Sequence, residues 1–467
     1  MSPFSHRERS NRGLKILTVL LAIGLLATLG LLFQTRSRLA QVTATDEAPD
    51  QPAAVDSAHE AVSSSAPVAA ENSVVAGDSA AAQELARAGA VAEAAATFPA
   101  AGAGSPVPPT EGFLRAGRPG VDYTAAYVVD RGTGRVLYEY NAHTPVPTAS
   151  MAKMMTSLIV MEEIEAGRLS LDDSVTISAR AAGMGGSQIY AAHNQIFSVR
   201  TLLAATMIQS ANDAATALAE KVAGSNEAFA DLMNRRAREL GLEGSTFYDP
   251  HGLPNPGQEN MMTARDLAVV GNELLRYPLM REYAATPTFP FENATFTAGM
   301  TNPNFLLRRY EGAYGIKTGY TVSAGFSVTA AARRGDMDVI AVVTGAKTSR
   351  GPQSSFALAG RLMDEVFRSW STVTPIRAGD EAGEVPVQRG ATPTVAALAA
   401  RDAAALVPRG QATVDWTLEP RAVEAPVAKG DTVGDIIVRQ GEAEVMRVPA
   451  LAADSVERRP WWKFWGG

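Results

Sequence analysis

The hydrophobic and polar positions divide the chain into an apolar run, a low-complexity stretch and two regions of regular periodicity. Residues 16–33 form an uninterrupted apolar run without a charged side chain. Residues 41–110 contain 23 alanines and a single aromatic residue, so they cannot bury enough apolar surface to offset their ordering entropy. Regular alternation begins near Gly120, which predicts that the folded part of the chain starts there.

Beyond Gly120, the periodicity predicts strands at both ends of a domain and helices between them. Period-two alternation predicts strands at Tyr123–Asp130, Arg135–Tyr140, Tyr314–Tyr320, Phe326–Ala332 and Val339–Val343. Helical periodicity predicts helices at Ser150–Glu165, Val199–Gln209, Asp213–Val222, Asn226–Glu239, Thr263–Arg276 and Gln353–Trp370. This order predicts an α+β domain whose first and last strands share one sheet. Residues 371–455 alternate short valine-rich runs with Gly and Pro, which predicts a small all-β domain.

The distribution of charge indicates where the N-terminal segments lie relative to a membrane. Residues 1–40 hold six Lys or Arg against one Glu, and all but two of these basic residues precede the apolar run. A helix over the apolar run would span about 27 Å, near the thickness of a bilayer's hydrocarbon core. Basic residues before such a run predict that the N-terminus stays inside and the rest is exported. We therefore expect residues 1–40 to be a cytoplasmic tail with a membrane anchor, or alternatively a cleaved signal sequence.

The two remaining segments are interpreted from composition alone. Residues 41–110 carry a net charge of -8 and are expected to be a disordered, Ala-rich acidic tether. Residues 456–467 contain three of the five tryptophans beside arginine and lysine, which favours contact with a membrane interface. Packing of this aromatic and basic tail on the β domain is the alternative.

Overall composition excludes several classes of protein. With 46% hydrophobic residues, the chain can bury a substantial core, which excludes wholesale disorder. The balance of 42 basic and 49 acidic residues argues against a nucleic-acid partner. Because there is no cysteine, disulfides, thiolate zinc sites and a cysteine nucleophile are excluded. The five histidines form no H-x-x-x-H pair, so no metal site is expected.

Three short motifs carry candidate chemistry, and each also has an ordinary structural explanation. Ser150 and Lys153 lie one helical turn apart, so the lysine could activate the serine, or the pair could be a helix cap and a solvated lysine. Ser210 and Asn212 lie at a break between helices, where they could point into a cleft or cap a helix. Lys317-Thr318-Gly319 lies in a strand, where it could bind a carboxylate and admit a substrate backbone, or protect a sheet edge.

The three motifs read S-x-x-K, S-x-N and K-T-G, and they begin at Ser150, Ser210 and Lys317. This order resembles the penicillin-binding and serine β-lactamase superfamily, and more narrowly the D-alanyl-D-alanine carboxypeptidases, or low-molecular-mass penicillin-binding proteins. Stretches that resemble the same family are Gly186–Tyr190, Met207–Ala214, Asp249–Leu253 and Ala425–Val427. The resemblance implies a β-lactamase/transpeptidase-like catalytic domain over residues 111–370, an antiparallel sheet with helices, followed by an accessory β domain over residues 371–455.

The resemblance also implies a role for each residue of the first two motifs. Ser150 would attack the carbonyl between two D-alanines, and Lys153 would be the general base. Burial and the nearby charge of Lys317 would keep Lys153 neutral. Ser210 would relay a proton to the leaving amine, and Asn212 would hold Lys153 and the substrate amide.

The third motif is expected to bind the substrate. Lys317 and Thr318 would bind the terminal carboxylate, and Gly319 would allow the close approach of the substrate backbone. The backbone N–H groups of Ser150 and Tyr320 would form the oxyanion hole.

Together, these expectations describe an exported serine-type D-Ala-D-Ala carboxypeptidase on the periplasmic face of a bacterial cytoplasmic membrane. It would remove the terminal D-alanine of peptidoglycan pentapeptide stems, in cell-wall maturation and the control of cell shape. The expected partners are stem peptides, β-lactams as covalent inhibitors, and the membrane; no metal or organic cofactor is implied. The alternatives are a β-lactamase, a DD-endopeptidase and a catalytically silent wall-binding scaffold.

Overall fold

The computed structural model describes residues 117–255, 257–293, 297, 299–347, 353–410 and 414–460. The expected anchor (1–40), the tether (41–110) and most of the aromatic tail therefore lie outside the described residues. Within the described ranges, no helix combines the length and the apolar character needed to cross a membrane.

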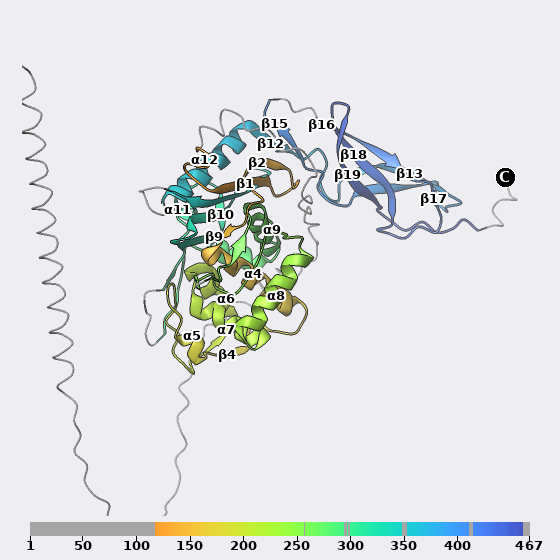
Figure 1. Cartoon of the computed structure of the whole chain (residues 1–467). Helices are drawn as coiled ribbons and strands as arrows, with labels where there is room; N and C mark the ends of the chain where they lie inside the picture. Colours follow the sequence, from red (N-terminus) through yellow and green to blue (C-terminus); the bar gives the residue numbers. More distant parts are fainter. Residues whose placement is uncertain are drawn as a thin grey trace, which may run out of the picture. The chain divides into compact units, whose positions relative to one another are not determined.

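A five-stranded antiparallel sheet forms the centre of the first domain, in the order β2-β1-β11-β10-β9 (Figure 1). The strands are β1 (Ala125–Asp130), β2 (Val136–Tyr140), β9 (Ala313–Thr321), β10 (Gly325–Arg334) and β11 (Met337–Ala346). In the pairing of β1 with β11, Val128 lies opposite Ala341. The prediction that the first and last strands of the domain share one sheet is confirmed, and β9 lies at the edge of that sheet.

Helices cover both faces of the sheet (Figure 1). Successive side chains of a strand point to opposite faces, so Val128 and Val129 enter different cores. Val128 belongs to the core under α12 (Gln353–Ser369), and Val129 belongs to the core of the helical lobe, which includes α9 (Ala264–Leu274).

The helical lobe fills the chain between β2 and β9. It contains η1 (Ala149–Ala152), α4 (Lys153–Glu165), α5 (Ala179–Ala182), α6 (Val199–Ala204), η2 (Ala205–Gln209), α7 (Asn212–Ala223), α8 (Asn226–Glu239), α9 and α10 (Pro278–Ala285). The short α11 (Leu306–Arg309) comes before β9 in the chain, and its Leu306 belongs to the core under α12. Short strand pairs join the loops: β3 (Val146–Pro147) with β6 (Met261–Met262), β4 (Ser174–Thr176) with β5 (Ile196–Ser198), and β7 (Thr288–Phe289) with β8 (Met300–Thr301).

The predicted helices are confirmed, with two local differences that concern the motifs. The predicted helix 150–165 begins as a 3₁₀ turn, η1, before the α-helix starts at Lys153. The predicted helix 199–209 changes from α-helix to a π-helical turn, η2, after Ala204. A π-turn inside a helix is often found at a functional site, because the extra residue redirects the backbone that follows.

The all-β prediction for the C-terminal region is also confirmed. β12 (Trp370–Val373) pairs with β15 (Ala405–Pro408). A six-stranded sheet has the order β16-β18-β19-β14-β13-β17, from β13 (Glu381–Gln388), β14 (Thr394–Ala399), β16 (Val414–Pro420), β17 (Val423–Glu424), β18 (Thr432–Gln440) and β19 (Ala443–Ala452). The buried residues of its core are valine, alanine and isoleucine.

Candidate active site

Ser150 lies in the 3₁₀ turn that leads into α4. The preceding residue, Ala149, has a φ of +48°, a left-handed conformation that is strained for a residue with a side chain. The cap position of the turn belongs to Thr148, whose side chain makes no capping bond, so Ser150 does not act as an ordinary helix cap. The expected one-turn spacing is confirmed, because Nζ of Lys153 lies 3.0 Å from Oγ of Ser150.

Lys153 is completely buried at the first position of α4 and is held from three sides. In addition to its contact with Ser150, Nζ of Lys153 donates to Oδ1 of Asn212 at 2.6 Å and to the main-chain carbonyl of His251 at 2.7 Å. Burial, and then the nearby charge of Lys317, hold the pKa of the Lys153 amine well below its usual range. This direction favours the neutral form of the amine, which is the form that a general base requires.

Ser210 occupies the bend between η2 and α7. Its φ is +62°, and it is 4% exposed. The N–H of Ser210 closes the π-turn on the carbonyl of Ala205, which also accepts the N–H of Ala211 at 3.0 Å. Asn212 then takes the first position of α7. No hydrogen bond to the Ser210 hydroxyl is formed by any residue of the described chain, so this hydroxyl is available to a ligand.

Lys317 lies in the middle of the edge strand β9 but is only 2% exposed, so the explanation as a surface lysine that protects a sheet edge is wrong. Burial lowers the pKa of its amine to about 7. Its Nζ has no hydrogen bond or ion pair with any residue that the structure describes. A buried cation without a partner is costly, and an anionic ligand would remove that cost.

The rest of the third motif lies further along β9. Thr318 is half-buried, and the exposed ring of Tyr320 stacks on Phe326 with 4.3 Å between centroids. A Cβ on Gly319 would lie 2.8 Å from the carbonyl oxygen of Thr148. The glycine is therefore required for packing of β9 against the turn that carries Ser150, a constraint additional to the expected approach of substrate.

The loop Asp249–Leu253, one of the stretches that resemble the family, contributes to the site although the sequence assigned it no role. Its Gly252 packs so closely that a Cβ would overlap the carbonyl of Ala149, beside Ser150. The carboxylate of Asp249 accepts the N–H groups of His251 and Gly252 and shapes this turn. His251 is buried, which lowers the pKa of its imidazole to about 4, and it acts on Lys153 through its main-chain carbonyl.

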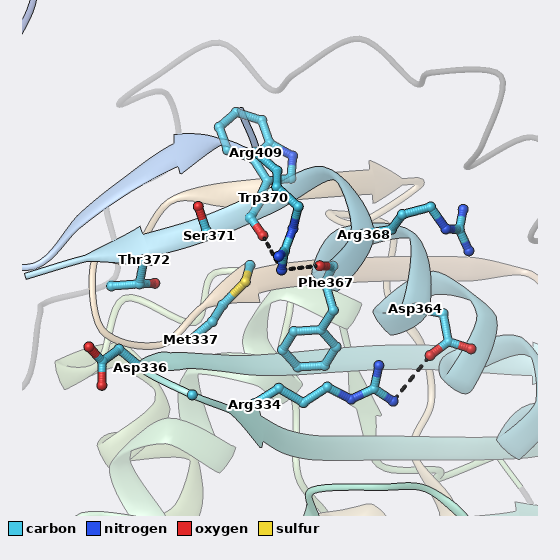
Figure 2. Close-up of a pocket in the computed structure, with 11 residues that line it drawn as sticks. Arg334, Asp336, Met337, Asp364, Phe367, Arg368, Trp370, Ser371, Thr372 and Arg409 are labelled. Carbon is cyan, nitrogen blue, oxygen red and sulfur yellow. Dashed lines mark hydrogen bonds and ion pairs between the residues drawn. The ribbon is translucent and has the colours of Figure 1, made fainter. Parts of the chain in front are cut away.

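A separate cavity of about 500 Å³ lies between the turn of β10 and β11, α12 and β12 (Figure 2). None of the motif residues lines it. Arg334 pairs with Asp364 at 3.2 Å, and Arg409 donates to the main-chain carbonyls of Phe367 and Trp370. Both guanidinium groups therefore already have partners in the walls of the cavity.

Comparison with known proteins agrees with this geometry. A sequence model of the family described as D-alanyl-D-alanine carboxypeptidase matches residues 114–348, and one described as penicillin-binding protein 5, C-terminal domain, matches residues 370–458. The D-alanyl-D-alanine carboxypeptidase DacF of Bacillus subtilis is 32% identical over 338 residues, which cover 72% of this chain and 86% of DacF. DacC of Escherichia coli is 36% identical over 350 residues, which cover 73% and 85% of the two chains.

Solved structures show the same similarity in three dimensions. The crystal structure of a peptidoglycan synthesis regulatory factor, PBP3 of Streptococcus pneumoniae, matches with a TM-score of 0.63 and 28% identity, over 72% of this chain and 99% of that one. The first family model covers half of this chain. DacF and DacC match this chain over most of their own length. The chain therefore belongs to the D-alanyl-D-alanine carboxypeptidases, the low-molecular-mass penicillin-binding proteins, and is a serine peptidase that acts on D-Ala-D-Ala.

Proposed function

We propose that Ser150 is the nucleophile of this carboxypeptidase and that Lys153 is its general base. The observation that carries the proposal is the coordination of the Lys153 amine. A neutral amine has two N–H groups and one lone pair, and both Asn212 Oδ1 and the His251 carbonyl can only accept hydrogen bonds. These two acceptors take both N–H groups, so the lone pair faces the Ser150 hydroxyl, whose proton it can remove.

The reaction then proceeds in two stages. Oγ of Ser150 attacks the carbonyl carbon between two D-alanines, and its proton passes to Lys153. The backbone N–H groups of Ser150 and Tyr320 stabilise the negative charge on the carbonyl oxygen. The C–N bond breaks, and Ser210 passes the proton from Lys153 to the leaving amine of D-alanine. Water then attacks the Ser150 ester and gives a proton to Lys153. The bond between the carbonyl carbon and Oγ breaks, Lys153 returns the proton to Oγ of Ser150, and the shortened peptide is released.

Lys317 and Thr318 bind the terminal carboxylate of the substrate, next to the close-packed Gly319. The support is that the buried amine of Lys317 lacks a partner in the described chain and lies close enough to Lys153 to depress its pKa. A carboxylate there would pair the buried charge. β-Lactams also carry a carboxylate, and several relatives are named for penicillin binding, so we expect β-lactams to acylate Ser150.

The proposed reaction is the trimming of peptidoglycan pentapeptide stems outside the cytoplasmic membrane, in cell-wall maturation and cell-shape control. The support is the apolar run at 16–33 with its preceding basic residues, the tether at 41–110 and the aromatic tail at 456–467. With residues 1–40 replaced by a cleavable signal sequence, the exported protein should leave the membrane fraction. An N-terminal sequence that starts after residue 40 would instead identify a cleaved signal.

The first test is release of D-alanine from a purified muropeptide pentapeptide. The unaltered chain should release it, Ser150→Ala should not, and Ser157→Ala should be a matched control, because Ser157 is a buried serine of α4 outside the site. Penicillin labelling of Ser150 without release would redirect the assay to cross-linked dimers, and rapid β-lactam turnover would indicate a β-lactamase. Neither release nor labelling would support the wall-binding scaffold.

A further inference from the structure

Asp213 is a fully buried acid that the proposed reaction does not use. It directly follows Asn212 in the first turn of α7. Its carboxylate accepts the main-chain N–H groups of Ile189 at 3.1 Å, Ala191 at 3.0 Å and Ala214 at 2.9 Å. No cation of the described chain forms an ion pair with it. Burial of a carboxylate is costly, so this one is expected to serve a purpose beyond capping its own helix.

The two distant N–H groups belong to a loop, residues 185–191, that also holds Asn212. The N–H of Asn212 donates to the carbonyl of Ser187 at 2.7 Å, and its side-chain Nδ2 donates to the carbonyl of Gly185 at 2.6 Å. The carboxylate accepts hydrogen bonds from the residues on either side of Tyr190. Tyr190 has a φ of +54° and is 52% exposed. Asp213 and Asn212 therefore hold the two ends of one short loop.

The orientation of the Asn212 amide depends on this loop. The oxygen and nitrogen ends of an asparagine amide are similar in shape, and its last torsion is only weakly restricted, so its partners decide which end faces which way. The Gly185 carbonyl can only accept, so it requires Nδ2 on its side. Oδ1 then faces Lys153.

We propose that Asp213 is a positioning residue. It fixes the 185–191 loop so that the Gly185 carbonyl holds the Asn212 amide with its oxygen toward Lys153. The inference rests on the proposed role of Lys153 as the base. When the hydrogen bonds from the loop to Asp213 are lost, Gly185 moves and the Asn212 amide turns. Lys153 then loses the acceptor that aligns its lone pair with Ser150.

If Asp213 acted only through its charge, its removal would change the acylation rate in the opposite direction. The charged groups that face Lys153 are Lys317 from β9, Asp249 from the 249–253 loop and Asp213 from α7, and the two carboxylates raise its pKa against burial and Lys317. His251 of the same loop is neutral above about pH 4. Removal of the Asp213 charge alone would lower the pKa of Lys153 and speed acylation at acid pH. Loss of positioning slows acylation at every pH.

The decisive experiment is a double-mutant cycle in the full chain. The second-order rate of acylation by a fluorescent penicillin is measured against pH for Asp213→Asn, Asn212→Ala and the double variant. We expect Asp213→Asn to lower the rate about 10- to 100-fold at every pH, and to lower it less than about twofold when Asn212 is already alanine. Equal losses in both backgrounds, or faster acylation at acid pH, would overturn the proposal.

Two further variants keep the test independent of folding. Asp266→Asn removes a buried acid from the first turn of α9 that contacts Ser245 and Arg265 and makes no contact with the loop. It should lower stability without changing the acylation profile. Should Asp213→Asn not fold, Asn293→Ala removes another side-chain anchor of the loop, the 2.9 Å bond from Asn293 Nδ2 to the Ile189 carbonyl.

Asn293→Ala should lower acylation in the same direction, and the loss should vanish in the Asn212→Ala background. An unchanged acylation rate in Asn293→Ala would count against a role for the loop. Failure of the proposed function is recognised separately, because Lys153→Met would then still acylate at the normal rate. Failure of the inference alone leaves the requirement for Lys153 intact.

Discussion

The catalytic domain and the C-terminal β domain bury different kinds of side chain. The catalytic domain buries charged or titratable groups: Lys153, Asp213, Asp249, His251 and Lys317. In the described chain from Trp370 onwards, no polar or charged residue is fully buried, and the buried residues of the sheet core are valine, isoleucine and alanine. The C-terminal domain places its charges in surface ion pairs such as Arg447–Glu444 and Arg421–Asp435.

This difference shows that the catalytic domain buries ionisable groups at a cost in stability, because the proposed reaction requires them. A lysine removed from water favours its neutral form, and that is the form a general base requires. Lys153 and Lys317 both have lowered pKa values because they are buried. Surface ion pairs carry no comparable cost, because their charges stay in contact with water. Replacing a buried lysine of the catalytic domain is therefore expected to lower activity with little loss of stability, whereas replacing a surface charge of the β domain should leave activity unchanged and alter stability only slightly.

The largest expected effect is that of Lys153→Met. Loss of the base should lower the acylation rate about 10²–10⁴-fold. The amine no longer has to be desolvated, but Asn212 Oδ1 and the His251 carbonyl lose their donor, so the free energy of unfolding should change by less than about 2 kcal/mol. The rate is measured with fluorescent penicillin and the stability by thermal unfolding. Lys221→Met, at an exposed position of α7, is the control and should change neither. Marked destabilisation by Lys153→Met would contradict the comparison.

Ile436→Ala tests the other domain. Ile436 is completely buried in the core of the β domain, and its truncation should cost about 2–5 kcal/mol of unfolding free energy. The acylation rate should not change at temperatures where the variant is folded, because the residues of the proposed site all precede Phe326. A parallel fall in the acylation rate would show that the two domains do not divide stability and chemistry in this way.

Lys317→Met separates substrate binding from acylation chemistry. A hydrogen bond to a charged group contributes about 1.5–3 kcal/mol, so kcat/KM for a peptide with a free C-terminal carboxylate should fall about 10- to 100-fold. The loss should be expressed mainly in KM, and a peptide with an amidated C-terminus should show no further loss. Lys347→Met is the matched control, because Lys347 begins a similar but glycine-free sequence, Lys347-Thr348-Ser349, and is exposed. Equal losses on both peptides would exclude carboxylate binding by Lys317.

The pH dependence follows from the signs of the two lysine shifts. As pH rises through about 7, Lys317 in the free enzyme loses its proton, because burial has lowered its pKa, and affinity for a carboxylate should fall. As pH falls through the lowered pKa of Lys153, the base is lost. The kcat/KM profile should therefore be bell-shaped, and the alkaline limb should be absent in Lys317→Met. An alkaline limb that persists in this variant would assign it to another group.

The same shifts make stability depend on pH. The unfolded chain binds the lysine protons more readily than the folded chain does, since the pKa of an unfolded lysine is about 10.4. Between about pH 7 and about pH 10, each pH unit should therefore add up to about 1.4 kcal/mol from Lys317 to the free energy of unfolding. Below about pH 7, Lys317 is protonated in both the folded and the unfolded chain, so it adds no slope to the dependence of stability on pH. Denaturant unfolding at several pH values measures the slope.

The sequence was sufficient to predict the parts of the site that depend on local spacing. The i, i+3 relation of Ser150 and Lys153 predicted their contact, because one helical turn fixes it. That Lys317 lies close to Lys153 was predicted only from the resemblance to a family. The two residues are far apart in the chain, and hydrophobic periodicity does not predict contacts at that separation. The main-chain carbonyl of His251 and the grip of Asp213 on the 185–191 loop were not predictable from side-chain patterns, because every residue carries the backbone groups involved.

The smallest expected effect is that of Arg447→Ala on the surface of the β domain. Arg447 on β19 forms an ion pair of 3.1 Å with Glu444 and lies 3.5 Å from Glu419, and all three side chains are exposed to water. Exposed pairs of this kind contribute little to stability, because solvent screens the charges and ordering the side chains costs entropy. Thermal unfolding in low and high salt should show at most a small loss, and added salt should reduce it. A loss as large as that of Ile436→Ala would mean that the β domain also depends on its charges, and the contrast between the two domains would not hold.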